Sequence, residues 1–204
     1  MMIAQATCQH LPLAEDSLDL IFTDPPYLKQ YLPCYFWLAA EARRVLKPGG
    51  FVLAMCGGYY LNQIFRMFDG AGLSYHWKLE NLMQNSSVVW PSKIIARSKS
   101  ILAYSKGASH PRCNTLGALH GGGMDKRFHE WGQDVNTARY YIDCFSRPGA
   151  LVCDPFIGGG TTAIACALID RRCVSFDIDP AAIATTVNRL AGAKIPTALP
   201  MFDF

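Results

Sequence analysis

The stretch "ALVCDPFIGGGTTAIACALI", residues 150–169, has the order of a strand, a turn and a helix. Its apolar beginning ends at Asp154, three glycines follow at 158–160, and helical spacing begins at Thr161. In open α/β sheets, ligands bind beyond the carboxyl ends of the strands, and glycines let the backbone approach a ligand closely. The stretch therefore predicts a cradle for a nucleoside or a carboxylate next to a helix N-terminus.

A second acid, Asp177, closes the next apolar run in "RRCVSFDID". It follows the glycine loop at about the 20-residue offset that is typical of a carboxylate binding ribose hydroxyls. A simpler alternative is that the glycines only form a tight turn, while Asp177 or Asp179 caps the following helix. The loop lacks the Gly-Lys-Ser/Thr ending of a P-loop, which disfavours a nucleotidase of that kind.

Short apolar runs alternate with helical patterns along most of the chain, which predicts an α/β fold in one domain over residues 1–204. The last helix should have Asp179 as its N-cap and Pro180 at its first position. We expect seven strands, near residues 2–6, 18–23, 51–56, 73–80, 99–105, 150–153 and 172–176. We expect helices near residues 36–47, 59–69, 137–146, 161–169 and 180–191.

Half of the 204 residues are hydrophobic and 17% are charged, which favours a compact core over a disordered chain. The N-terminus lacks the pattern of a signal peptide, and no segment has the apolar length of a membrane span. Eight cysteines without a Cys-x-x-Cys pair suggest buried thiols in a reducing compartment, not disulfides or zinc ligands. We therefore expect a soluble cytoplasmic protein without a metal site.

The sequence "IFTDPPYLKQ", residues 21–30, places Asp24 at the end of another apolar run, so Asp24 should share a sheet edge with the glycine loop. Pro25 and Pro26 have a fixed φ and no N–H, so the turn is stiff and the acceptors of Asp24 and Pro25 stay in place. Two such acceptors match the two hydrogens of an exocyclic amino group, and Tyr27 offers a ring for stacking. Alkyl transfer to that nitrogen needs mainly positioning and preorganisation. Without the glycine loop, the same turn would be interpreted as a rigid structural turn in which Asp24 is only a structural acceptor.

Together these motifs resemble those of DNA methyltransferases that methylate amino groups with S-adenosylmethionine. "DPPY" is similar to their catalytic motif and "DPFIGGGTT" to their cofactor loop, and "RVLKPGG" at residues 44–50 also resembles a family segment. The catalytic motif precedes the cofactor loop, as in the circularly permuted β-type group. The resemblance implies a Rossmann-like, seven-stranded methyltransferase sheet with helices on both faces.

The resemblance also implies residue roles. The catalytic turn would hold the target base through Asp24, Pro25, Pro26 and Tyr27. The cofactor would contact Asp24, Asp154, Phe156, Gly158, Gly160, Thr161, Thr162 and Asp177.

Two segments depart from the family pattern. Gln133 and Asp134 replace the usual Lys-Pro, so Asn136 and Thr137 would contact the methionine part of the cofactor instead. Thr7 replaces the aspartate of a usual Gly-Asp-Cys, and its hydroxyl would partly take over from that carboxylate.

The first residue of the catalytic motif is aspartate where N4-cytosine enzymes usually have serine, which favours N6-adenine in DNA as the target. The recognition region is reduced to a loop near residues 107–128, which predicts low or short-site specificity. Such an enzyme would suit restriction–modification, a phage or a mobile element. The alternatives are N4-cytosine methylation of DNA, adenine methylation of RNA, and a catalytically idle accessory subunit that binds nucleic acid.

The modest net charge of +3 is concentrated between Lys93 and Arg127. We expect Lys93, Arg97, Lys126 and Arg127 to contact phosphates of double- or single-stranded DNA, although a solvated hairpin is the alternative. A target base must leave the duplex stack, and Trp90 is a candidate for stacking, with a core role equally open. The family resemblance leaves a homodimer open. The histidines match no metal-ligand spacing.

Overall fold

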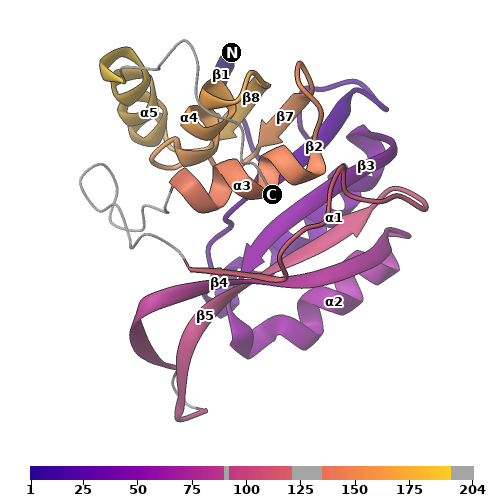
Figure 1. Cartoon of the computed structure of the whole chain (residues 1–204), viewed down its shortest axis with the longest axis vertical. Helices are drawn as coiled ribbons and strands as arrows, with labels where there is room; N and C mark the ends of the chain where they lie inside the picture. Colours follow the sequence, from indigo (N-terminus) through magenta and orange to yellow (C-terminus); the bar gives the residue numbers. More distant parts are fainter. Residues whose placement is uncertain (90–91, 121–134, 194–204) are drawn as a thin grey trace.

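A mixed sheet of eight strands forms the centre of the protein in the computed structural model, which describes residues 1–89, 92–120 and 135–193 (Figure 1). The strand order is β1-β8-β7-β2-β3-β5-β4-β6. The first five strands of this order run parallel, and β5 runs antiparallel to its neighbours β3 and β4. The strands are β1 (Met2–Gln5), β2 (Leu18–Thr23), β3 (Leu46–Cys56), β4 (Ser74–Val89), β5 (Ile94–Ser105), β6 (Ala118–His120), β7 (Leu151–Asp154) and β8 (Arg172–Asp177).

The described residues thus hold eight strands, one more than the seven expected from the sequence. The additional strand is β6, which pairs with residues 80–82 of β4. It lies inside the stretch 107–128, which was expected to be a loop throughout. Three residues are too few to show the two-residue periodicity of a strand, so the pattern carried no sign of β6. Residues 121–128 lie outside the described part of the chain.

Helices cover both faces of the sheet, as the sequence predicts (Figure 1). Two helices, α1 (Leu32–Val45) and α2 (Leu61–Gly70), contribute to one buried core, and α3 (Val135–Phe145) and α4 (Thr161–Leu168) contribute to the other. The remaining helix, α5 (Pro180–Gly192), lies next to β1 and β8. Short 3-10 turns, Lys29–Tyr31 and Gly58–Tyr60, precede α1 and α2.

The two long antiparallel strands β4 and β5 form a hairpin that extends well beyond the rest of the sheet (Figure 1). Both strands are longer than the periodicity of the sequence indicates, because their outer parts carry exposed and polar side chains that do not alternate as in a half-buried strand. Among the described residues, no helix is long and apolar enough to cross a membrane.

Candidate functional site

Three aspartates lie at the carboxyl ends of three neighbouring parallel strands. Asp154 and Asp177 are the last residues of β7 and β8, and Asp24 directly follows β2. Parallel strands end at the same edge of a sheet, which is where open α/β sheets bind ligands. The fold therefore brings the two motifs of the sequence to one place, here called the carboxylate edge and defined by Asp24, Asp154 and Asp177.

Asp154 is buried and links the two motifs. The hydroxyl of Thr23 donates a hydrogen bond to Asp154 Oδ1 at 2.7 Å, and the N–H of Phe156 donates to the same oxygen at 3.1 Å. Burial raises the pKa of Asp154 to about 6, hydrogen bonds including one from Thr162 oppose the increase, and the nearby carboxylate of Asp24 adds to it. This carboxylate ties the strand that carries the DPPY turn to the glycine loop.

The glycine loop is fastened to α5. Thr186 Oγ1 donates to the carbonyl oxygen of Gly158 at 2.9 Å, and Arg189 donates to that of Gly159 at 2.7 Å. Gly160 has φ of +78°, and a Cβ atom there would lie 2.6 Å from Cγ2 of Thr186. Only glycine satisfies both the backbone conformation and the close approach of α5. The loop is consequently held in one shape before any ligand arrives.

Asp177 and Asp179 have distinct local roles. Asp179 caps α5, because its carboxylate accepts from the N–H of Ala181 at 2.8 Å. Asp177 accepts from the N–H of Gly158 and from the N–H of Asp179, each at 3.0 Å. These contacts fix the Asp177 carboxylate against the glycine loop, and each of its oxygens retains a second lone pair for a ligand hydroxyl.

The DPPY turn is held by side chains as well as by its prolines. The hydroxyl of Tyr27 donates a hydrogen bond to Asp24. Burial and then the Asp24 carboxylate raise the pKa of Tyr27 well above its ordinary value, so the phenol stays protonated. The hydroxyl of Tyr35 donates to the carbonyl oxygen of Met55 at 3.0 Å and lies 3.4 Å from that of Pro25. Two acceptors of the turn are therefore fixed at the carboxylate edge.

The ring of Tyr27 lies at the carboxyl end of β3. A Cβ atom at Gly57 would lie 3.4 Å from Cβ of Tyr27, so the ring packs against the strand end. On β5, the ammonium of Lys99 lies over the ring, 5.1 Å from its centroid, as in a cation–π contact. Pro26, between the two acceptors and the ring, is exposed.

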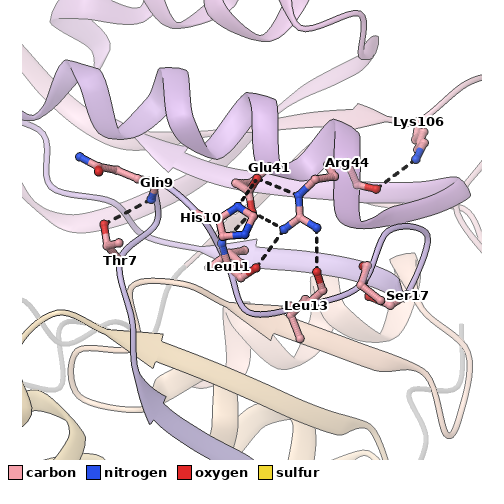
Figure 2. A network of polar contacts seen from close by, with 10 residues as sticks. Thr7, Gln9, His10, Leu11, Leu13, Ser17, Glu41, Arg44 and Lys106 are labelled. Atoms are coloured by element: carbon pink, nitrogen blue, oxygen red, sulfur yellow. Dashed lines mark hydrogen bonds and ion pairs between the residues drawn. The ribbon is translucent and has the colours of Figure 1, made fainter.

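Thr7 is exposed in the loop that follows β1, and hydrogen bonds between the backbone of this loop and the side chains of Glu41 and Arg44 fasten it to α1 (Figure 2). Thr7 Oγ1 accepts from the N–H of Gln9 at 3.3 Å. Glu41 accepts from the N–H of Leu11 at 2.7 Å and from Arg44 at 2.6 and 2.9 Å. Burial alone would raise the pKa of Glu41, but the hydrogen bonds from Arg44 and Leu11 lower it overall. Arg44 belongs to the "RVLKPGG" segment, which thereby has a structural role.

The other residues singled out from the sequence differ in how far they are buried. Asn136 is exposed and Thr137 is buried in the first turn of α3. Phe156 and Thr161 are half-buried beside the glycine loop.

Of the residues expected to contact nucleic acid, two can be described. Lys93 lies exposed at the hairpin turn with φ of +57°, and Arg97 is exposed on β5. Trp90, Lys126 and Arg127 lie outside the described residues. No group of three metal-ligating side chains occurs in the part of the chain that the structure describes.

Sequence reasoning did not find four residues that shape the site. Thr23 could have been suspected, because it directly precedes Asp24 at a strand end. The contacts of the others depend on which helix or strand packs against which turn, and the sequence carries no sign of that. These residues are Tyr35, Thr186 and Arg189.

Comparisons with known proteins find similarity to DNA methylases. A family model for DNA methylases, covering N6-adenine and N4-cytosine enzymes, matches residues 109–188. The type II methyltransferase M.HpaI of Haemophilus parainfluenzae is 24% identical over 221 aligned positions, which cover 87% of this chain and 69% of that protein. These matches support a DNA amino-methyltransferase. S-adenosylmethionine is the cofactor that they support.

Solved methyltransferase structures share the fold. The PvuII cytosine-N4-specific DNA methyltransferase has a TM-score of 0.80 at 18% identity, over 95% of this chain and 87% of that chain. M1.HpyAVI in complex with SAM has a TM-score of 0.76 at 19% identity, over 93% of this chain and 98% of that chain. The range matched by the family model contains Asp154 and Asp177 but not the DPPY turn, whose interpretation depends on the geometry described above.

Proposed function

We propose that the chain transfers a methyl group from S-adenosylmethionine to the N6 amino group of adenine in DNA, with low or short-site specificity. The observation that carries this proposal is the hydrogen bond between Thr23 and Asp154, which joins the strand of the DPPY turn to the glycine loop. An amino-group site and a cofactor site then share the carboxylate edge. The turn precedes the glycine loop in the chain, which supports the permuted β-type order.

The residues of the glycine loop fit this cofactor. The carboxylate of Asp177, held beside the loop, has acceptor capacity for ribose hydroxyls, and Thr161 begins the helix whose N-terminus favours a carboxylate group. When bound, S-adenosylmethionine supplies an electrophilic methyl group. The carbonyl oxygens of the loop accept hydrogen bonds from Thr186 and Arg189, which both belong to α5.

Asp24 and Pro25 would accept the two hydrogens of the target amino group and direct its lone pair towards the methyl carbon. The carboxyl group of Asp24 has several lone pairs, so it can accept from the amino group while it accepts from Tyr27. The ring of Tyr27 would stack on the flipped base. With S-adenosylmethionine bound, the nitrogen would take the methyl group as the methyl–sulfur bond breaks, and it would then release one proton to Asp24 or to water. This geometry stabilises the transition state by positioning, without a strong base.

Nucleoside mass spectrometry tests the proposal. DNA incubated with the purified chain and S-adenosylmethionine should contain N6-methyladenine, and the Asp24→Ala variant should lose the product. Isothermal titration should show that Asp24→Ala largely retains its affinity for the cofactor, because Asp24 is only one of the expected cofactor contacts and Asp177 and the glycine loop are unchanged. DNA that stays unmodified with the wild-type chain would count against the proposal.

N4-cytosine methylation is a second candidate, because the PvuII enzyme of similar fold is cytosine-N4-specific and the two acceptors fit either amino group. RNA adenine is a third target with the same amino group. Single- and double-stranded DNA and RNA, offered in parallel, separate these candidates by the methylated nucleoside that each yields.

A catalytically idle accessory subunit would keep the fold without the chemistry. Titration of the purified chain with S-adenosylmethionine separates this candidate from the enzymes. A chain that binds no cofactor would favour the accessory role, whereas binding together with methyl transfer excludes it. A homodimer remains part of the proposal, and sedimentation of the same sample measures it.

A further inference from the structure

The β4–β5 hairpin overhangs the carboxylate edge. β3 ends at Cys56, which pairs with Ser100 of β5. β5 runs antiparallel to β3, so its segment 94–99 continues beyond the edge. It pairs with β4 from Asn81 opposite Lys99 to Val89 opposite Ile94, with a register shift between Leu82 and Ser87. At about 3.3 Å per residue, this segment extends roughly 20 Å past the end of β3. Figure 1 shows the hairpin extending beyond the rest of the sheet. Under the proposed function, a flipped base would enter on this side.

One face of this projecting segment leads back to the catalytic turn. Side chains two residues apart in a strand share a face, so Ile95, Arg97 and Lys99 lie on the same side of β5. Lys99 is the inner end of this series, with its ammonium over the ring of Tyr27. Val88 on β4 pairs with Ile95 and extends the same face.

The outer end of this face is apolar and open to solvent. Ile95 is 63% exposed and Val88 is 48% exposed, although side chains of this kind are usually buried. Arg97 is exposed between this apolar pair and Lys99. The order from the catalytic turn outwards is thus an aromatic ring, two cations and an apolar pair.

We propose that this face receives the opened duplex, with Lys99 and Arg97 on phosphates next to the flipped nucleotide and the Ile95–Val88 pair inserted where the base has left the stack. The inference rests on the proposed DNA methyltransferase function. Two cations suit a phosphate backbone, and their continuity with the ring of Tyr27 places that backbone on this face. In other protein–DNA complexes, apolar side chains such as isoleucine insert between base steps as wedges.

Ile94 offers a matched control for Ile95. It is the same residue type, 61% exposed, on the neighbouring position of β5 and hence on the opposite face. Both Ile95→Ser and Ile94→Ser should fold like the wild type, because neither side chain is buried. The substrate is a duplex oligonucleotide around a site located by sequencing modified bases in DNA treated with the wild-type chain. A second duplex has an abasic position opposite the target, which makes flipping easier.

The Ile95→Ser variant should lower kcat/KM on the fully paired duplex about tenfold, since the gap in the stack is no longer filled. The loss should be at most about twofold on the duplex with the abasic position, and Ile94→Ser should match the wild type on both. Fluorescence of 2-aminopurine at the target should rise less on binding to Ile95→Ser than to the wild type.

Equal losses of kcat/KM in Ile95→Ser and Ile94→Ser, or an unchanged kcat/KM in Ile95→Ser, would contradict the insertion of the Ile95–Val88 pair. The methyltransferase proposal would remain intact. If Ile95→Ser instead converts a wild-type dimer into a monomer in sedimentation, the face binds a second copy and the inference is wrong. If the wild-type chain methylates no nucleic acid, the proposed function is wrong, and the inference about the hairpin, which rests on it, is wrong as well.

Discussion

The hydroxyl of Thr23 donates a 2.7 Å hydrogen bond to the buried carboxylate of Asp154, although 131 residues separate them in the chain. Thr23 ends β2 and immediately precedes the DPPY turn, and Asp154 ends β7 and precedes the glycine loop. Together with the pairing of β2 and β7, this contact holds the DPPY turn close to the glycine loop. A residue with a structural contact of this kind should affect both stability and the reaction.

Thr23→Val should destabilise the protein by about 1–3 kcal/mol at pH 8, because a buried carboxylate loses a donor while the side chain keeps its shape. The cost should shrink at pH 5, where Asp154 is largely protonated in the folded state. Urea unfolding at the two pH values measures this difference. Thr185→Val, which removes an exposed hydroxyl on α5, should change stability by less than about 0.5 kcal/mol at either pH.

The raised pKa of Asp154 predicts a pH dependence of stability. In the folded state this pKa is about 6, whereas an unfolded aspartate has a pKa of about 3.9. Between these values the folded state binds more protons, so the contribution of Asp154 to the free energy of unfolding is complete below about pH 4 and is lost as the pH rises through about 6.

Asp154→Asn removes this titration, so its stability relative to the wild type should increase with pH across the window, by at most about 1.4 kcal/mol per pH unit. Urea unfolding of both proteins between pH 4.5 and about 7.5 measures the trend. A difference that does not vary with pH would show that Asp154 does not titrate there.

Gly160→Ala should destabilise the protein by about 1–3 kcal/mol, because φ of +78° disfavours a side chain and the added Cβ would meet Thr186. Since the loop can relax only by moving away from α5, affinity for S-adenosylmethionine should fall as well. Thermal unfolding and isothermal titration measure the two effects. Gly70→Ala is the control, because nothing lies within 4 Å of a Cβ atom there. A control that loses as much stability as Gly160→Ala would refute the steric argument.

The sequence was sufficient to predict the α/β fold, the shared edge of Asp24 and Asp154, and the capping of α5 by Asp179, because each depends on local pattern or on the rule for parallel strands. The length of the β4–β5 hairpin was not predictable in the same way. Its outer residues are exposed on both faces, so no alternation marks Ile94 and Ile95 as strand.

The partners of the site residues depend on tertiary packing, which leaves no trace in local sequence. Gly160 is one of three consecutive glycines, and only the position of Thr186 on α5 shows why a side chain is excluded there. Asp177 is a second case, because its contacts with the N–H groups of Gly158 and Asp179 are set by how the loop meets the strand end.

Substitutions of Tyr27 separate the two parts of its side chain. Tyr27→Phe keeps the ring and removes the hydrogen bond to Asp24, so kcat/KM for methyl transfer should stay within about fivefold of the wild type, as expected for one replaceable hydrogen bond. Tyr27→Ala removes the stacking surface and should lower kcat/KM about 10- to 100-fold, since base–aromatic stacking contributes about 1–3 kcal/mol.

The affinity of both Tyr27 variants for S-adenosylmethionine should remain close to that of the wild type, because the glycine loop and Asp177 are untouched. Tyr60→Ala is a matched control, as an aromatic ring on the 3-10 turn after β3 that packs against Tyr59. Rates of methyl transfer at saturating cofactor give the comparison. A Tyr27→Phe variant as impaired as Tyr27→Ala would mean that the phenol hydroxyl, through its hydrogen bond to Asp24, matters more than the ring.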